Sequence, residues 1–176
     1  MGLNYEIRNI INDMSEAVQQ KFDITIPIID IDEVVYKMGG IITEDASLDS
    51  FADGQIRKYG ANGFEIVVSR LQPPTRRKFT IAHELGHLFL HMGFLTNQNK
   101  WKAQNDKVFY RNGNSDLEYQ ANEFAAAFLM PKSEYKKIMD QNTNGRTVYT
   151  SEIARHFGVS VDTASNRGKW LGLLEW

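Results

Sequence analysis

The chain has 176 residues, which is enough for one domain with a sizeable core or for one domain and a small appendage. Apolar residues make up 42% and charged residues 24%, and the net charge of -2 excludes a uniformly basic surface for nucleic acid. The sequence holds no cysteine, which excludes disulfides and thiolate metal sites and fits a reducing compartment.

The beginning of the chain carries no sign of a targeting signal. Charged and amide side chains lie among the apolar residues of segment 1–20, so we expect no secretory signal peptide. No apolar run approaches the ~20 residues that a membrane-spanning helix needs. We therefore expect a cytoplasmic protein without a membrane anchor, while its oligomeric state stays open.

Two helices are predicted at the start of the chain. Apolar residues recur every three or four positions in residues 5–22, which is typical of an amphipathic helix. An extended segment follows at 23–30. A second helix is expected to start at a cap on Asp30 or Asp32 and to end before Gly39.

The next segment has the pattern of β-structure. Short strands are predicted at 41–43, 54–59 and 64–69, and Asn62-Gly63 is a strong hairpin signal between the last two. We expect two or three antiparallel strands, with a loose edge near 64–69 that could hold an extended peptide by strand addition.

A long helix is predicted over residues 75–91. Pro73-Pro74 ends the preceding segment, and Thr75 is the expected N-cap. Apolar residues cover much of the circumference of this helix, so we expect it to be largely buried.

Residues 92–114 show no helical period, and 107–111 is expected to be a strand or an ordered loop. Three aromatic residues of segment 92–114, Trp101, Phe109 and Tyr110, are expected to pack on the core rather than to line a cleft.

A second strong helix is predicted at 115–130, and Pro131 ends it. A short polar helix at 133–139, an Asn-rich loop at 141–145 and two helices within 150–174 complete the chain. We expect a domain at 1–132 and a helical, helix-turn-helix-like subdomain at 133–176 that packs on it.

The predicted helix at 75–91 contains His83-Glu84-Leu85-Gly86-His87, which is a complete H-E-x-x-H motif. Residues four apart on a helix share a face, so the two imidazoles can bind one metal ion. Glu84 lies beside them, where it can take a proton from water at that metal. A surface helix could carry the motif by chance, but buried polar residues need partners, and a metal supplies one. The motif therefore predicts a metal-dependent hydrolase, most often a peptidase.

A third protein ligand is needed for such a site. His91 lies ~12 Å along a continuous helix from His83, which excludes it as a ligand. His156 is expected to be a surface or packing residue of the C-terminal helices. Glu118 on the second strong helix is the favoured ligand, and Asn122 shares its face and can support one of the histidines.

Two alternatives compete with this interpretation of Glu118. Glu123 lies about 140° around the helix from Glu118, so both cannot face one metal. Ser115 and Glu118 also form an S-x-x-E capping box, in which the carboxylate would bond to the start of its own helix. We favour ligation by Glu118 because the metal needs a third donor. Nitrogen and oxygen donors suit both zinc and manganese.

Two separated motifs, residues 77–88 and 118–131, together resemble the ImmA/IrrE family of zinc metallopeptidases. Residues 153–160 and 167–173 are similar to the C-terminal segment of that family, and the resemblance covers most of 24–174.

This resemblance implies an α+β, zincin-like (gluzincin-like) fold, in which a small antiparallel sheet packs on the active-site helix beside a second ligand helix and a helical C-terminal segment. It implies zinc bound by His83, His87 and Glu118, with Glu84 as the general base. It also implies a protein substrate, a helix-turn-helix repressor often encoded on mobile elements or in stress regulons, and hence a role in transcription regulation.

The expected reaction is hydrolysis of a peptide bond within a protein, a zinc-dependent endopeptidase activity. The donor that stabilises the oxyanion stays open between Tyr110, Tyr149 and an arginine of the 92–114 loop.

A DNA- or protein-binding regulator with a structural or degenerate metal site is the alternative function. Residues 150–170 have a helix-turn-helix pattern with Arg155, Arg167 and Lys169. The same segment carries Glu152 and Asp162, so we expect a helical cover on the core rather than direct nucleic-acid binding.

Overall fold

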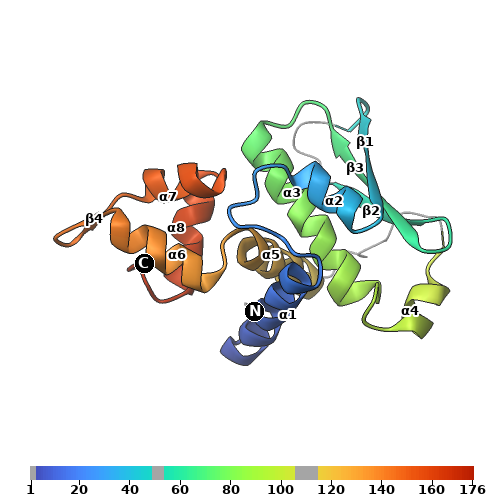
Figure 1. The fold of residues 1–176 in the computed structure, drawn as a ribbon, viewed down its shortest axis with the longest axis horizontal. Helices are drawn as coiled ribbons and strands as arrows, with labels where there is room; N and C mark the ends of the chain where they lie inside the picture. Colours follow the sequence, from blue (N-terminus) through green and yellow to red (C-terminus); the bar gives the residue numbers. More distant parts are fainter. Residues whose placement is uncertain (1–2, 49–53, 106–114) are drawn as a thin grey trace.

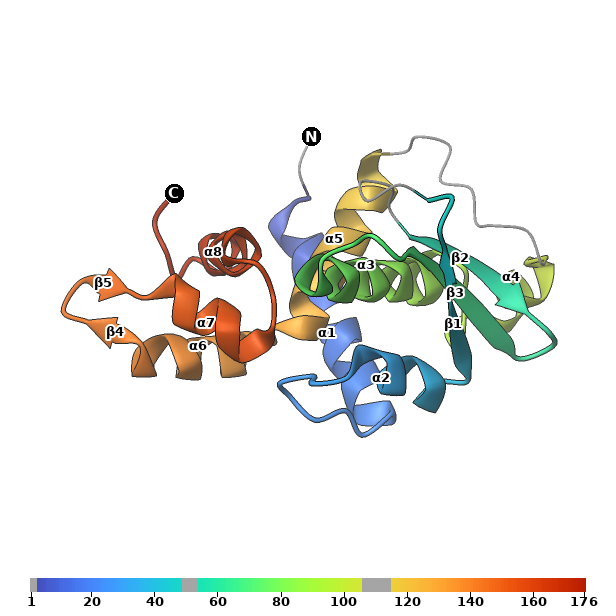
Figure 2. The same ribbon diagram turned by 90° about the horizontal axis from the view of Figure 1, so that it is seen from above.

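The structure is a computed structural model that describes residues 3–48, 54–105 and 115–176. Its fold is α+β, as the sequence predicts. The central element is helix α3 (Pro74–Gly86), which contacts strand β3 (Gly63–Ser69) on one side and helix α5 (Ser115–Leu129) on the other (Figure 1, Figure 2). The H-E-x-x-H motif therefore lies in the interior, between the sheet and a second helix.

The first helix, α1 (Tyr5–Lys21), matches the predicted amphipathic helix. Its first turn is capped by Asn4, whose Oδ1 accepts a hydrogen bond from the Ile7 amide at 2.8 Å. The buried face of α1 packs along α5, where Gln19 Nε2 donates to the carbonyl of Phe128 at 2.8 Å. This hydrogen bond holds α1 against α5.

Helix α2 (Ile31–Lys37) begins at the expected cap. The Asp30 carboxylate accepts hydrogen bonds from the amides of Asp32 and Glu33, at 2.9 Å and 3.2 Å. These bonds satisfy two amides that have no partner within the first turn.

The sheet has the order β1-β3-β2, with β1 at Gly40–Asp45 and β2 at Gln55–Tyr59. Strands β2 and β3 form the predicted antiparallel hairpin. Strand β1 is parallel to β3, so the expectation of a purely antiparallel sheet is wrong. The tight turn at Asn62-Gly63 fixes only the direction of the two strands that it joins, and β1 lies on the other side of β3.

Strand β3 is the central strand, paired on both sides, and its Phe64, Ile66 and Val68 are fully buried. The expected free edge near 64–69 is therefore wrong. Strands β1 and β2 are the edges of this sheet within the described parts of the chain.

The helix predicted at 75–91 changes geometry within the motif. It begins with Pro73 at the cap position, so Thr75 lies inside the first turn and is not the N-cap. Proline suits the first helical position, which Pro74 occupies, because the first-turn amides have no helical partner. The α-helix ends at Gly86 and continues as a π-helical turn, η1 (His87–His91), in which the Met92 amide bonds to the carbonyl of His87 at 3.0 Å.

A short helix, α4 (Gln98–Ala103), lies in the segment where no helix is expected. It is capped by Asn97, whose Oδ1 accepts from the Lys100 amide at 3.0 Å, and such a short helix is too brief to show a period. Trp101 packs on Phe94 in the core as predicted, with 5.0 Å between ring centroids. The prediction for residues 107–111, with Phe109 and Tyr110, falls outside the described residues.

The C-terminal helices gather at one end of the molecule (Figure 1). They are α6 (Lys132–Gln141), α7 (Thr150–Phe157) and α8 (Val161–Trp170). The predicted loop after α6 contains instead a small hairpin of β4 (Thr143–Asn144) and β5 (Thr147–Val148). Gly158 ends α7 with a φ of 65°, which permits the sharp turn into α8. The division into domains 1–132 and 133–176 stays a prediction.

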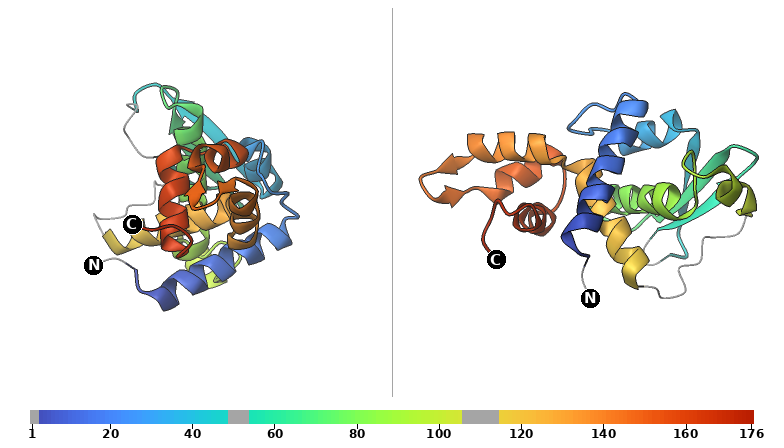
Figure 3. Two further views of the ribbon diagram at one scale, coloured as in Figure 1. Left: turned by 90° about the vertical axis from the view of Figure 1, so that its left-hand side faces the viewer. Right: turned by 90° about the horizontal axis from the view of Figure 1, so that it is seen from below.

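A buried ionic cluster joins these helices to the rest of the fold. Glu123 on α5 pairs with Arg8 on α1 and with Arg167 on α8, the latter at 3.0 Å. Asn12 bonds to both Glu123 and Arg167, at 2.8 Å and 2.7 Å. Burial lowers the pKa of Arg167, and the Glu123 carboxylate opposes that effect. The view from below shows α1 between the C-terminal helices and the sheet (Figure 3).

In the described segments, no helix combines the length and the apolar character that crossing a bilayer requires.

Candidate metal centre

The two ligand helices approach each other at backbone contact. A Cβ atom at Gly86 would lie 3.0 Å from both Cα and O of Ala121, so a larger residue at position 86 would push α5 away. The glycine inside the motif therefore has a packing role: it lets α5 lie close enough for Glu118, one turn before Ala121, to reach the histidines of α3 and η1.

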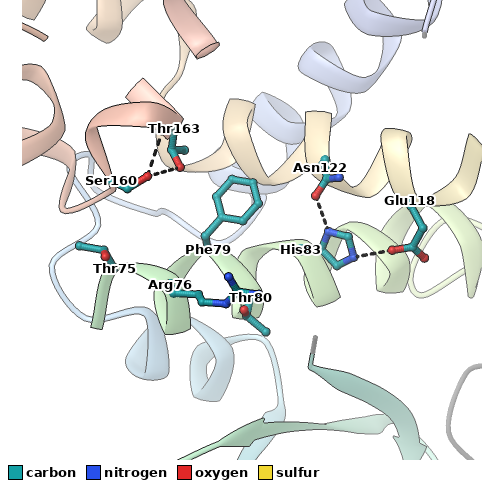
Figure 4. Close-up of a pocket in the computed structure, with 9 residues that line it drawn as sticks. All are labelled: Thr75, Arg76, Phe79, Thr80, His83, Glu118, Asn122, Ser160 and Thr163. Atoms are coloured by element: carbon teal, nitrogen blue, oxygen red, sulfur yellow. Dashed lines mark hydrogen bonds and ion pairs between the residues drawn. The ribbon is translucent and has the colours of Figure 1, made fainter. Parts of the chain in front are cut away.

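The structure brings together the three residues that the sequence predicts as ligands. The Nε2 atoms of His83 and His87 lie 3.3 Å and 3.4 Å from the two carboxylate oxygens of Glu118, and 3.1 Å from each other. Each of the three residues offers one ligand atom, and these three atoms all lie within 4.8 Å of one another. Both histidines are buried, and the side chain of Glu118 is partly exposed toward a pocket (Figure 4).

The donor set fits a divalent cation. Asn122 Oδ1 lies 2.9 Å from His83 Nδ1, and an amide oxygen only accepts, so Nδ1 carries the hydrogen and the lone pair of Nε2 faces Glu118. A carboxylate is also an acceptor. Acceptors that converge on one point repel each other unless a cation lies among them. Two imidazoles and a carboxylate are the protein ligands of many catalytic zinc sites, and they also suit manganese.

His91 is next to this group and does not belong to it. Its Nδ1 lies 2.8 Å from His87 Nδ1, and its Nε2 lies 3.0 Å from Gln120 Oε1 on α5. Burial lowers the pKa of His91. The exclusion of His91 as a ligand agrees with this position behind His87.

Glu84 of α3 is completely buried. Gly54, at the entrance to β2, packs directly against Thr80 and Glu84. Sequence reasoning missed this contact, because Asp53-Gly54 has the pattern of an ordinary turn. The only available signal was that a glycine also permits close approach to another chain segment.

A pocket of about 390 Å³ opens beside His83 and Glu118. One wall comes from α3 and one from α5, and the third comes from the start of α8, where Ser160 Oγ lies 2.8 Å from Thr163 Oγ1 (Figure 4). Ser160 and Thr163 were not predicted to lie here, because the packing of α8 against α5 is a long-range contact. The lining residues are Thr75, Arg76, Phe79, Thr80, His83, Glu118, Asn122, Ser160 and Thr163.

The competing candidates lie elsewhere. Glu123 is engaged by Arg8 and Arg167. His156 Nε2 lies 3.9 Å from Glu134 in the C-terminal helices. The carboxylate of Glu118 faces the two histidines. The alternative capping box with Ser115 stays a prediction, because the side chain of Ser115 lies outside what the structure describes.

Of the three oxyanion candidates, only Tyr149 lies among the described residues. Tyr149 is half exposed beside α7 and does not line the described pocket. Tyr110 and the arginine at 111 lie outside the described residues.

Residues 44–169 match a peptidase family described as the IrrE N-terminal-like domain. The chain belongs to this family. The resemblance to ImmA/IrrE proteins is thereby confirmed, and a metallopeptidase type of function is supported. No protein of curated function matches the chain.

The chain also resembles a solved structure, a transcriptional regulator from Mycobacterium tuberculosis, with a TM-score of 0.59 at 19% identity. The alignment covers 92% of this chain and 50% of that regulator, so the chain spans half of its length. At this identity the likeness shows a shared fold.

Proposed function

We propose that this protein is a zinc-dependent endopeptidase that cleaves a helix-turn-helix transcriptional repressor. The observation that carries the proposal is the convergence of His83, His87 and Glu118 beside an open pocket, with Glu84 next to them in the motif. Membership of a peptidase family gives independent support.

The reaction follows from the acid-base properties of the site. Zinc, when bound, would lower the pKa of water to about 7 and polarise the scissile carbonyl. Glu84 accepts the proton of the attacking water and delivers it to the nitrogen of the leaving amine. Its burial excludes bulk water, which would otherwise compete for that proton.

The substrate would bind in extended form. Within the described residues β2 is paired on one side only, and its start lies against Glu84 through Gly54. A peptide that adds to the outer edge of β2 would pass the catalytic carboxylate and continue into the pocket between α3 and α8. This path replaces the edge that the sequence suggested near 64–69.

The choice of a repressor as substrate rests on the family resemblance. The regulator of similar fold is compatible with a role in transcription. The cytoplasmic location and the link to mobile elements belong to the same proposal.

Direct DNA binding is less well supported. Arg167 is internal and paired with Glu123, and Arg155 forms a two-pronged ion pair with Glu152 at 2.6 Å and 2.7 Å. Arg167 is therefore inaccessible to DNA, and the exposed Arg155 is paired with a neighbouring carboxylate. A strongly salt-dependent affinity for duplex DNA would favour the regulator alternative.

The decisive experiment compares the wild type with Glu84→Gln. The zinc-loaded proteins are incubated with a purified helix-turn-helix repressor, and fragments are identified by mass spectrometry. We expect a chelator-sensitive cleavage in the wild type, and at least a 1,000-fold lower rate in Glu84→Gln with zinc retained, since general base and proton shuttle are both lost. Cleavage at the wild-type rate by the variant would exclude this role of Glu84.

A further inference from the structure

A chain of three side chains leads away from the proposed metal centre. His87 is fully buried, and its Nδ1 lies 2.8 Å from Nδ1 of His91. His91 is also buried, and its Nε2 lies 3.0 Å from Oε1 of Gln120 on α5. The first and last residues of the π-helical turn are thus bonded to each other, and the last one is bonded to the second ligand helix.

The donor and acceptor in each of these hydrogen bonds follow from Gln120, the last of the three side chains. The Gln120 oxygen can only accept, so His91 must donate from Nε2. A neutral imidazole has one N–H, and His91 Nδ1 is therefore an acceptor. His87 must then donate from Nδ1, which leaves an unprotonated Nε2 facing Glu118 and His83.

The opposite polarity is incompatible with metal binding. If position 120 donated to His91, every bond in the chain would reverse, and His87 would carry its hydrogen on Nε2. That hydrogen would occupy the coordination site. An amide side chain can give either polarity, depending on its orientation, and the side chain of Gln120 presents its oxygen.

We propose that His91 and Gln120 are positioning residues that fix the tautomer and ring orientation of His87, so that its Nε2 is ready for the metal. Asn122 acts in the same way on His83 through a single bond. This inference rests on the proposed metal-dependent function, but the tautomer that it assigns is a property of the metal-free protein.

Variants at position 120 separate the effect of hydrogen-bond direction from the effect of side-chain packing. Gln120→Glu keeps an acceptor, Gln120→Leu removes the bond, and Gln120→Lys offers only a donor. Because Gln120 is half-buried on α5 and all three replacements favour helices, we expect each variant to fold. His91→Phe breaks the chain at its centre and is a second, more severe test.

The first measurement is the tautomer of His87 in metal-free, ¹⁵N-labelled protein at about pH 8, where free imidazoles are neutral. Long-range ¹H–¹⁵N spectra are simple here because the chain has four histidines. We expect hydrogen on Nδ1 of His87 and Nε2 of His91 in the wild type and in Gln120→Glu. We expect the opposite tautomers in Gln120→Lys.

The second measurement is zinc affinity, by competition with a chelator. We expect Gln120→Glu to bind at least as tightly as the wild type, Gln120→Leu to bind about 10-fold more weakly and Gln120→Lys up to about 100-fold more weakly. The tautomer measurement distinguishes reversal from simple charge repulsion, since a remote charge alone would not move the hydrogen.

The outcomes distinguish this inference from the proposed function. Unchanged tautomers in Gln120→Lys, or zinc affinities within 2-fold of the wild type in all variants, would overturn the positioning role while the peptidase proposal stands. The expected tautomers together with a failure of the wild type to bind zinc would support the hydrogen-bond chain and reject the zinc-dependent function.

Discussion

Gly54 faces Glu84 so closely that a Cβ atom at position 54 would lie 3.0 Å from Glu84 Cγ and 3.3 Å from its Oε1. The nearest atom to such a Cβ would be Cγ2 of Thr80, at 2.8 Å. The backbone at the start of β2 therefore sets the position of the proposed general base. A side chain there would have to displace either β2 or Glu84.

We expect Gly54→Ala to lower the rate of substrate cleavage about 10- to 100-fold with normal zinc content, because displacement of a catalytic group by about 1 Å has costs of that order. The double variant Gly54→Ala/Thr80→Ser lacks the nearest methyl group and should recover part of the loss. Cleavage assays and zinc analysis on the three proteins test this. Full activity of Gly54→Ala would show that Glu84 does not depend on the close contact.

Glu118 and Glu123 should respond differently to removal. We expect Glu118→Ala to lose zinc, because it deletes one of the three converging donors. Glu123→Ala should keep zinc but lose about 3–5 kcal/mol of unfolding free energy, because it leaves the buried Arg167 without its carboxylate.

Metal content and urea unfolding of the two variants provide the measurement. Loss of zinc in Glu123→Ala alone would mean that the third ligand has been assigned to the wrong residue.

Tyr135 should make the fold sensitive to alkali. Its hydroxyl is buried and donates to the carbonyl of Ala164 at 2.7 Å, and burial raises the pKa of Tyr135 to about 12. The unfolded chain loses this proton near pH 10, while the folded protein keeps it up to about pH 12. The stabilisation is therefore complete below about pH 10, and about 2–3 kcal/mol is lost as pH rises through that window.

Unfolding free energies of the wild type and Tyr135→Phe, measured from about pH 9 to pH 12, isolate this effect. We expect the advantage of the wild type to fall, and finally to change sign, over that range. Tyr149→Phe is the control, because Tyr149 is half exposed. An advantage that did not change with pH would show that the Tyr135 hydroxyl titrates like an exposed phenol.

The sequence predicts well those parts of the site that depend on local geometry. His83 and His87 share a helix face because of their spacing, and Glu118 and Asn122 do so for the same reason. Once α3 and α5 touch at Gly86, the pairs meet, and the structure places Asn122 on His83 as expected.

Features that depend on long-range contacts could not be predicted in this way. Nothing in the sequence near Ser160 indicates that it borders the pocket, and a glycine at position 54 indicates only that another segment can approach it closely. The π-helical turn also escaped prediction, because one extra residue in a turn leaves the apolar pattern of 87–91 almost unchanged. The parallel direction of β1 depends on the connection from β1 to β2, which skips the position of β3, and the pattern of residues within a strand does not encode such a connection.

The carboxylate of Glu123 has a consequence for biosynthesis. It is shared by Arg8 and Arg167, and α8 also supplies one wall of the pocket through Ser160 and Thr163. A nascent polypeptide from which α8 has not yet emerged lacks both that wall and half of the buried charge pairing. The pocket wall and the full pairing of Glu123 would therefore be completed only after the ribosome has released α8.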